Sequence, residues 1–308
     1  MIEVASLVKS YGALTAVDGV SFTAPDGRIF GLLGPNGAGK STTIGCISGL
    51  LRPTSGTVRV MGHDVTRGVE ARRALGVVPQ EIALYEELSA TENLRYWGGA
   101  FGLKGADLKR RIGAVLEKAG LSDRASEPVK RFSGGMKRRL NFACGVVHEP
   151  RVLLLDEPTV GVDPQSRVHL LDLVREQARA GTCVLYTTHY MEEAESLCDE
   201  LAIIDHGRII ARGTLPELRR LTGERDLVRL SGRFDPPRVA EALRTLPGVE
   251  SIQLETETVS LGVLQASKEL PELLGALAAT GAEIRETILT QPNLESLFIK
   301  LTGKEFRE

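Results

Sequence analysis

The chain has 308 residues, of which 42% are hydrophobic and 25% charged, and its formal net charge is -2. This mixture is typical of a globular protein and excludes a disordered or fibrous chain, and the length favours two domains. The near-neutral charge gives no electrostatic argument for nucleic acid as a partner. No apolar run approaches the roughly 20 residues that a membrane-spanning helix needs.

Short apolar strands alternate with helical stretches from Met1 to about Leu221. The near-continuous apolar runs at 29–33 and 152–155 are typical of strands buried on both faces of a parallel sheet that is covered by helices. Helices are predicted at 40–50, 108–118, 134–148 and 164–180, and another opens at the capping box 89–92. We therefore expect an α/β domain over residues 1–221.

The second region begins near Gly223 after a short linker around 221–225. Its first six elements follow the βαββαβ order of a split-βαβ, ferredoxin-like domain. A small α+β domain is thus expected over residues 222–308. The predicted elements are strand 226–230, helix 237–246, strands 249–254 and 258–263, helix 268–280, strand 283–289 and a last helix 294–302.

Residues 34–41 match the phosphate-loop pattern G-x-x-x-x-G-K-[ST], placed between an apolar strand and a helix. Backbone N–H groups of such a loop and the helix dipole hold phosphate oxygens. Lys40 is expected to reach the β/γ-phosphates and Ser41 to ligate Mg²⁺. The motif predicts a nucleoside triphosphate and Mg²⁺ as ligands, with a nucleotide-binding set of Gly34, Pro35, Asn36, Gly37, Ala38, Gly39, Lys40, Ser41 and Thr42.

The apolar run 152–155 ends in two adjacent carboxylates, Asp156 and Glu157. A strand sends consecutive side chains to opposite faces, so the two acids can have different roles. Asp156 fits the residue that holds Mg²⁺, and Glu157 fits the base that polarises a water molecule against the γ-phosphate. Such acids on their own are ordinarily solvated, but together with the phosphate loop they predict a phosphate-loop NTPase, a class with many members.

Residues 132–137, Phe-Ser-Gly-Gly-Met-Lys, resemble the L-S-G-G-Q signature of ATP-binding cassette (ABC) ATPases. The order of motifs along residues 1–221 is similar to that family too. The resemblance implies a phosphate-loop NTPase cassette with a mostly parallel sheet core, an antiparallel β subdomain and a helical signature subdomain. It also implies that Ser133, Gly134, Gly135 and Met136 bind the γ-phosphate held by a second subunit, most simply in a homodimer. Met136 replaces the glutamine of the family pattern.

The same resemblance gives roles to four further residues. Tyr11 stands where the family places an adenine-stacking aromatic, although a partly buried strand tyrosine is the alternative. Gln80 resembles the loop glutamine that senses Mg²⁺ and the γ-phosphate, and His189 resembles the switch histidine that contacts the γ-phosphate in catalysis. Asp163 would belong to a loop that communicates across the dimer, but Asp163-Pro164 is also a good helix start.

Residues 132–140 and the ending 294–303 resemble the ATPase subunits of drug-resistance and nodulation-type exporters, which work with separate membrane permeases. This implies a peripheral protein at the cytoplasmic face of the cell membrane. The permease would dock near Gln80, Leu84 and Tyr85, unless Leu84 and Tyr85 pack internally.

The second domain carries none of these motifs, so we expect it to regulate the protein or to stabilise its dimer. A cargo or ligand pocket there is the alternative. For the whole chain, the alternative function is a soluble, nucleotide-switched ABC protein that is not coupled to transport.

Overall fold

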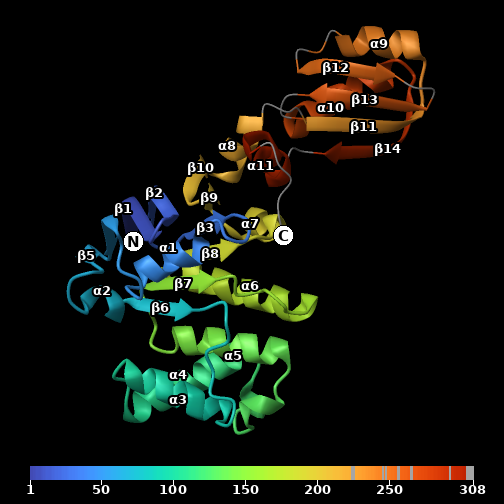
Figure 1. Cartoon of the computed structure of the whole chain (residues 1–308). Coiled ribbons are helices and arrows are strands. Elements are labelled where there is room, and N and C mark those ends of the chain that lie inside the picture. The colour runs from blue at the N-terminus through green and yellow to red at the C-terminus, as the bar shows by residue number, and fades with distance from the viewer. Residues whose placement is uncertain are drawn as a thin grey trace. The chain divides into compact units, whose positions relative to one another are not determined.

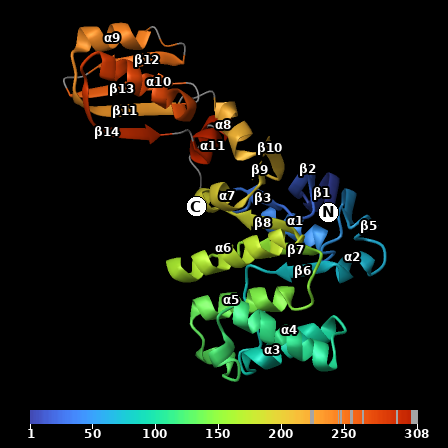
Figure 2. The ribbon, with the colours of Figure 1, turned by 180° about the vertical axis from the view of Figure 1, so that it is seen from behind.

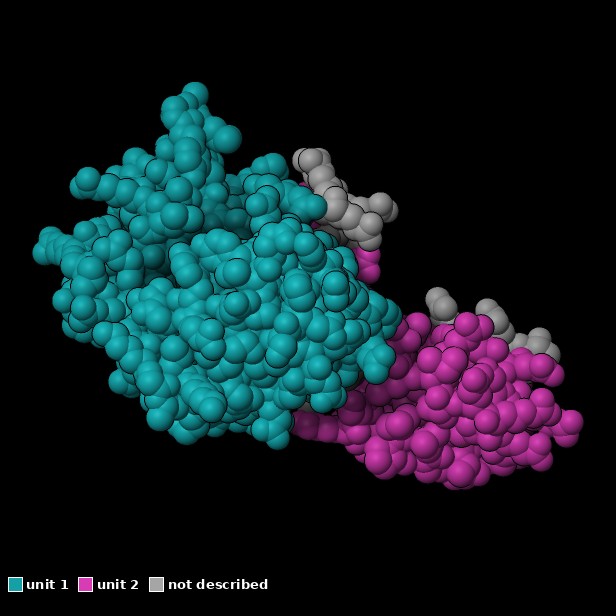
Figure 3. All heavy atoms as spheres, turned by 90° about the horizontal axis from the view of Figure 1, so that it is seen from below, with its two compact units in different colours: residues 1–215, 306–308 teal, residues 216–305 magenta. Residues whose placement is uncertain are grey.

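The computed structural model describes residues 1–222, 226–244, 246, 248–254, 257–263, 266–290 and 293–302. The chain forms two compact units, Met1–Leu215 and a second unit that begins at Pro216 (Figure 3). The division precedes the predicted one because helix α8 (Leu215–Thr222) belongs largely to the second unit, where the Leu221 carbonyl accepts a hydrogen bond from Lys300. Residues 223–225 of the predicted linker and Gly303 of the predicted ending lie outside the described residues.

The first unit is built around a six-stranded sheet with the strand order β10-β9-β3-β8-β7-β6 (Figure 1). Neighbouring strands are parallel except for the edge pair β9 and β10. Every residue of β3, β7 and β8 is buried, as the apolar runs predict. The strands are β3 (Ile29–Leu33), β6 (Leu75–Val78), β7 (Val152–Asp156), β8 (Cys183–Thr188), β9 (Glu200–Asp205) and β10 (Arg208–Gly213).

A second sheet of the first unit is antiparallel, with the order β2-β1-β4-β5. This confirms the predicted antiparallel subdomain. Its strands are β1 (Ile2–Tyr11), β2 (Leu14–Ala24), β4 (Ser55–Val60) and β5 (His63–Asp64). The helices α1 (Lys40–Ile47), α2 (Glu70–Arg73), α6 (Pro164–Arg179) and α7 (Met191–Leu197) complete this part of the unit. Helix α1 is shorter than predicted, and Gly49 just beyond it has a φ of 74°.

Three helices form the predicted helical subdomain and group together in both ribbon views (Figures 1 and 2). They are α3 (Ala90–Ala100), α4 (Gly105–Lys118) and α5 (Gly134–Val146), with short 3-10 turns at Ser122–Arg124 and Val129–Arg131. Their side chains share one apolar core that includes Leu94, Leu116 and Leu140. The capping box predicted at the start of α3 is present, with Ser89 and Glu92 bonded reciprocally.

The second unit holds a four-stranded antiparallel sheet with the order β12-β13-β11-β14. Its elements after α8 are β11 (Asp226–Arg233), α9 (Pro236–Arg244), β12 (Val249–Leu254), β13 (Thr258–Val263), α10 (Ala266–Ala279), β14 (Glu283–Thr290) and α11 (Leu294–Thr302). In β11, Val228 and Leu230 are buried whereas Leu227 and Arg229 are exposed, so one sheet face is covered. The element order agrees with the prediction, and the ferredoxin-like class stays a prediction.

Among the described residues, we find no helix with the length and hydropathy that crossing a membrane would require.

Candidate functional site

The loop between β3 and α1 is shaped by glycines. Gly37 and Gly39 have φ values of 80° and 105°, a region that favours glycine. A Cβ at Gly39 would lie 2.5 Å from the carbonyl oxygen of Ala16, so no larger residue fits there. Gly39 precedes α1 without a capping side chain, and the first turn of α1 has no acidic residue. The helix start therefore keeps its N–H groups and its positive dipole for an anion.

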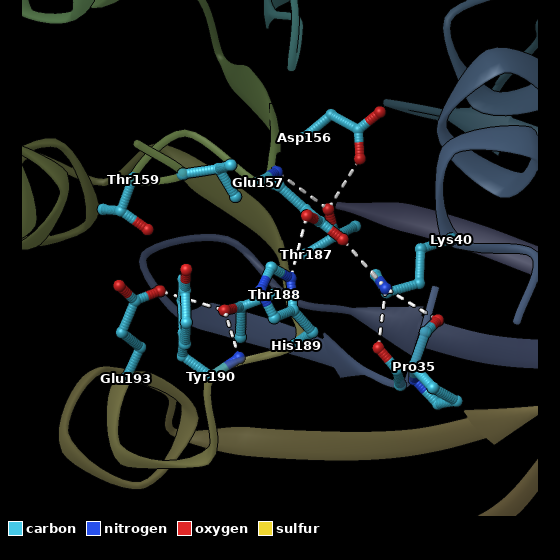
Figure 4. Close-up of polar contacts among 12 residues, drawn as sticks. Pro35, Lys40, Asp156, Glu157, Thr159, Thr187, Thr188, His189, Tyr190 and Glu193 are labelled. Carbon is cyan, nitrogen blue, oxygen red and sulfur yellow. Dashed lines mark hydrogen bonds and ion pairs between the residues drawn. The ribbon is translucent and has the colours of Figure 1, made fainter. Parts of the chain in front are cut away.

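Lys40 is buried beside this loop, with only 4% of its side chain exposed. Its Nζ donates hydrogen bonds to the carbonyl oxygens of Gly34 (2.6 Å) and Pro35 (3.0 Å). The same ammonium lies 2.9 Å from Glu157 Oε1 (Figure 4). Two loop carbonyls and one carboxylate thus hold the Lys40 ammonium at the N-terminus of α1.

The end of β7 positions the two predicted acids. Asp156 pairs in register with Thr187 of β8, and its Oδ1 accepts a hydrogen bond of 2.7 Å from the Thr187 hydroxyl. Glu157 has a φ of 44°, which is uncommon outside glycine. Its backbone N–H donates to the Thr187 carbonyl and hydroxyl oxygens. Thr187 was not predicted as a site residue, although it is a polar residue at the end of an apolar strand.

Glu157 connects the phosphate loop to His189. Its Oε1 faces Lys40, and its Oε2 lies 2.9 Å from His189 Nδ1 (Figure 4). Glu157 is nine-tenths or more buried, and His189 is largely buried. The structure therefore brings three predicted catalytic residues, Lys40, Glu157 and His189, into one chain of contacts, an ion pair followed by a hydrogen bond.

A polar cavity of about 180 Å³ lies at this point. Gln80, which follows β6, and Glu157 line it together with the phosphate loop. The full lining is Ala16, Asn36, Gly37, Ala38, Gly39, Lys40, Ser41, Thr42, Gln80 and Glu157. Tyr11 ends β1 in the same hairpin that carries Ala16, and 47% of its side chain is exposed. The exposed ring of Tyr11 has Lys9 Nζ 4.8 Å from its centroid.

The signature residues lie elsewhere in the chain, at the start of α5. Ser133 caps this helix, and its hydroxyl oxygen accepts a hydrogen bond from the Met136 N–H at 3.3 Å. Ser133 and Gly134 are exposed. Gly135 is buried, and a Cβ there would collide with the Ser166 hydroxyl. The start of α5 is thus a helix terminus that faces solvent, outside the residues that line the polar cavity.

Arg138 of α5 forms hydrogen bonds to two loops beside the candidate site. The sequence did not reveal this role. One guanidinium nitrogen donates to the Gln80 carbonyl, and the other donates to the Val160 carbonyl at 3.1 Å. Burial lowers the pKa of this guanidinium. Arg138 therefore connects α5 with the loop that carries Gln80 and with the loop after Glu157.

Asp163 is the N-cap of α6. Its Oδ1 accepts a hydrogen bond of 2.9 Å from the Ser166 N–H, and this bond lowers the pKa of the carboxyl group. Pro164 occupies the first turn. The helix-start alternative is therefore present in the structure, and the role of Asp163 across a dimer stays a prediction.

An apolar groove of about 410 Å³ lies between the six-stranded sheet and the helical subdomain. Its lining includes Leu50, Val77, Pro79, Ala83, Trp97 and Phe101. Leu50 is 83% exposed, and Val77 and Phe101 are exposed as well. Of the predicted permease contacts, Leu84 packs partly against the core of the helical subdomain. Tyr85 is exposed and meets Tyr96 edge-on, with ring centroids 4.9 Å apart.

These features define the class of the protein as a phosphate-loop ATPase of the ATP-binding cassette type. A family model described as ABC transporter matches residues 17–160. The linearmycin resistance ATP-binding protein of Bacillus subtilis is 42% identical over the whole of both chains. A Nod factor export ATP-binding protein of Ralstonia nicotianae is 41% identical over all of this chain and 95% of its own length. The chain therefore belongs to the ATP-binding subunits of ABC transporters.

Solved structures agree with this assignment. An ATP-binding subunit of an ABC transporter matches with a TM-score of 0.67 and 38% identity, over 72% of this chain and 93% of that one. A dimeric bacterial ABC transporter cassette matches with a TM-score of 0.64 and 25% identity, over 70% of this chain and 98% of that one.

Proposed function

We propose that the chain is the ATP-hydrolysing subunit of an exporter, which works as a homodimer and drives a separate membrane permease. The observation that carries this proposal is the chain of contacts from Lys40 through Glu157 to His189 beside the polar cavity. The names of the two relatives, which concern resistance and export, support the direction of transport.

In this proposal the loop residues 34–42 bind the phosphates of ATP, and the exposed face of Tyr11 stacks on the adenine. Glu157 is the base that takes a proton from the attacking water, and His189 contacts the γ-phosphate. Lys40 and Glu157 form an ion pair. A phosphate that reaches the Lys40 ammonium competes with Glu157 Oε1, and this competition frees the carboxylate oxygen for water.

Ser41, Gln80 and Asp156 fit a Mg²⁺ site because all three offer the oxygen ligands that this ion prefers. Ser41 and Gln80 line the polar cavity, and Thr187 fixes the Asp156 carboxylate through Oδ1. When bound, Mg²⁺ would neutralise charge on the β- and γ-phosphates.

The second half of each nucleotide site comes from the partner copy in this proposal. Ser133, Gly134, Gly135 and Met136 would approach the γ-phosphate held by the other chain, with Asp163 in the loop between the two sites. The solvent-facing start of α5 supports this arrangement, since its N–H groups and dipole can accept an anion from outside. The second unit would stabilise the dimer by keeping the two copies close.

The permease would occupy the apolar groove beside Gln80, with Tyr85 at its border. Contiguous exposed apolar side chains such as Leu50, Val77 and Phe101 are typical of a surface that a partner covers. This contact would hold the chain at the cytoplasmic face of the membrane.

The test is the Glu157→Gln variant, which keeps the shape of the side chain and removes the base. We expect it to bind ATP with an affinity close to that of the wild type, and to lower kcat by about 100-fold or more. Retention of labelled ATP and steady-state hydrolysis measure the two effects. Asp123→Asn, at an exposed carboxylate, is the matched control. Hydrolysis within a few-fold of the wild type would reject Glu157 as the base.

A further inference from the structure

A buried carboxylate lies near His189 and takes no part in the site described above. Glu193, in α7, has a relative exposure of 2%. Burying a carboxylate is costly unless it is paired and hydrogen-bonded, and apolar replacements of buried ion pairs are often neutral or stabilising. A role in core stability alone therefore does not explain Glu193, and its contacts point to a different one.

The Oε2 atom of Glu193 holds the loop that carries His189. It accepts hydrogen bonds from the Tyr186 hydroxyl (2.8 Å) and the Thr188 hydroxyl (2.9 Å). The Thr188 oxygen in turn accepts a hydrogen bond of 2.9 Å from the Tyr190 N–H (Figure 4). Both neighbours of His189 in the sequence are thus fixed by one carboxylate oxygen and the hydroxyl bonded to it.

The Oε1 atom of Glu193 faces Arg167 of α6, with Arg167 Nε at 2.5 Å. The guanidinium carbon of Arg167 also lies 4.5 Å from the centroid of the Tyr190 ring, and that ring lies 4.1 Å from the His189 imidazole. The backbone N–H of Arg167 donates a hydrogen bond to the backbone carbonyl of Asp163, the residue that caps α6. Arg167 therefore joins the start of α6 to the His189 loop along two routes.

We propose that Glu193 and Arg167 are positioning residues for ATP hydrolysis, which hold the His189 imidazole against Glu157 and couple it to the Asp163 start of α6. His189 Nδ1 is 2.9 Å from Glu157 Oε2, so a small shift of the loop breaks this contact. Neither Glu193 nor Arg167 reaches the polar cavity, and both act through the imidazole. The inference rests on the proposed function, since it concerns the same site.

The test is the ATPase activity of the full chain with Arg167→Met and, separately, Glu193→Gln. We expect each to lower kcat by about tenfold or more, as for other small misplacements of a catalytic group, with the ATP KM within about twofold of the wild type. Arg175→Met is the matched control. Arg175 also lies on α6 and bonds to α7, but at the Ser196 carbonyl, away from the His189 loop. It should keep nearly full activity.

A double-mutant cycle with His189→Ala separates positioning from general stability. If Arg167 acts through His189, Arg167→Met lowers kcat no further once His189 is replaced by alanine. Additive losses, equal losses in Arg167→Met and Arg175→Met, or wild-type kcat in Arg167→Met would each overturn the inference. The Arg167 side chain is 30% exposed, so its replacement disturbs the core less than that of Glu193. Arg167→Met alone is therefore sufficient for the test if Glu193→Gln unfolds. Wild-type hydrolysis no faster than that of Lys40→Ala would instead overturn the proposed function, and the inference with it.

Discussion

The starts of α1 and α5 are both helix N-termini with glycines, yet they differ in what surrounds them. The start of α1 follows Gly39 without a capping side chain, and Lys40, Gln80 and Glu157 lie around its cavity. The start of α5 is capped by Ser133, and Ser133 and Gly134 are exposed. Each can attract an anion, but of the two only α1 has the predicted catalytic residues Lys40 and Glu157 beside it. In the proposed function, α5 is therefore the half of a site that a second molecule completes.

The start of α6 sharpens this contrast. There the Asp163 carboxylate itself bonds to the first turn, through the Ser166 N–H. A negative side chain at the helix terminus occupies the place that an anion would take. Of these three helix starts, α6 is therefore the one least suited to bind phosphate.

Removing the cation at α1 should have the largest effect. Lys40→Ala deletes a charge-assisted contact to phosphate, typically about 1.5–3 kcal/mol, so ATP affinity should fall by about 10- to 100-fold and hydrolysis should be lost. Calorimetric titration with ATP and a steady-state assay measure these changes. The exposed Lys109→Ala is the control. Unchanged ATP affinity in Lys40→Ala would show that the α1 cavity does not hold the phosphates.

Blocking the start of α5 should separate binding from turnover. Ser133→Arg places a long side chain where the partner's nucleotide would approach, so a single chain should still bind ATP with normal affinity while hydrolysis falls by about tenfold or more. Ser122→Arg, at another exposed serine of the same subdomain, is the control. Loss of ATP binding by the isolated Ser133→Arg chain would mean that α5 contributes to the site of its own chain.

The sequence was sufficient for those parts of the site that are contiguous along the chain. The phosphate loop, the Asp156–Glu157 pair and the capped start of α5 each combine a motif with a local signal for a strand or helix. The same applies to the buried strands, because near-continuous apolar runs are typical of strands buried on both faces of a parallel sheet. The structure places these elements as predicted.

The parts that the sequence did not predict depend on which strands and helices become neighbours. Thr187 touches Asp156 and Glu157 only because β7 and β8 pair in that register. Arg138 belongs to none of the motifs, but its guanidinium donates hydrogen bonds to backbone carbonyls of two distant loops. Glu193 belongs to the same group, since its partners come from β8 and α6.

Removing the second unit should have little effect on the α1 site. A chain that ends at Gly213, the last residue of β10, keeps both sheets and the apolar cores of the first unit. We expect its ATP affinity to stay within about twofold of the full chain, while dimer formation weakens because the two copies lose a link. Calorimetry and sedimentation measure these properties. Lost ATP binding in a truncated chain that unfolds cooperatively would place part of the nucleotide site in the second unit.

The smallest effect concerns His148, beyond the C-terminal end of α5. Its Nε2 lies 2.9 Å from the Leu75 carbonyl, its ring stacks on Phe101, and burial lowers its pKa. The unfolded chain therefore takes up this proton first, and stability falls as the pH drops below about 6.5. His148→Phe should lose less stability between pH 7 and pH 5 than the wild type, in urea titrations, with unchanged hydrolysis at pH 7.5. An equally steep pH dependence in both proteins would contradict the assignment.

The most direct measurement of the shared site is complementation between two inactive chains. Lys40→Ala damages the α1 half of a site, and Ser133→Arg damages the α5 half. A mixed dimer therefore retains one intact site, built from the α1 start of the Ser133→Arg chain and the α5 start of the Lys40→Ala chain. The hydrolysis rate of an equimolar mixture should rise toward about a quarter of the wild-type rate, because about half of the randomly formed dimers are mixed and each has one intact site of two. A mixture that hydrolyses ATP no faster than the sum of the two separate variants would contradict the account.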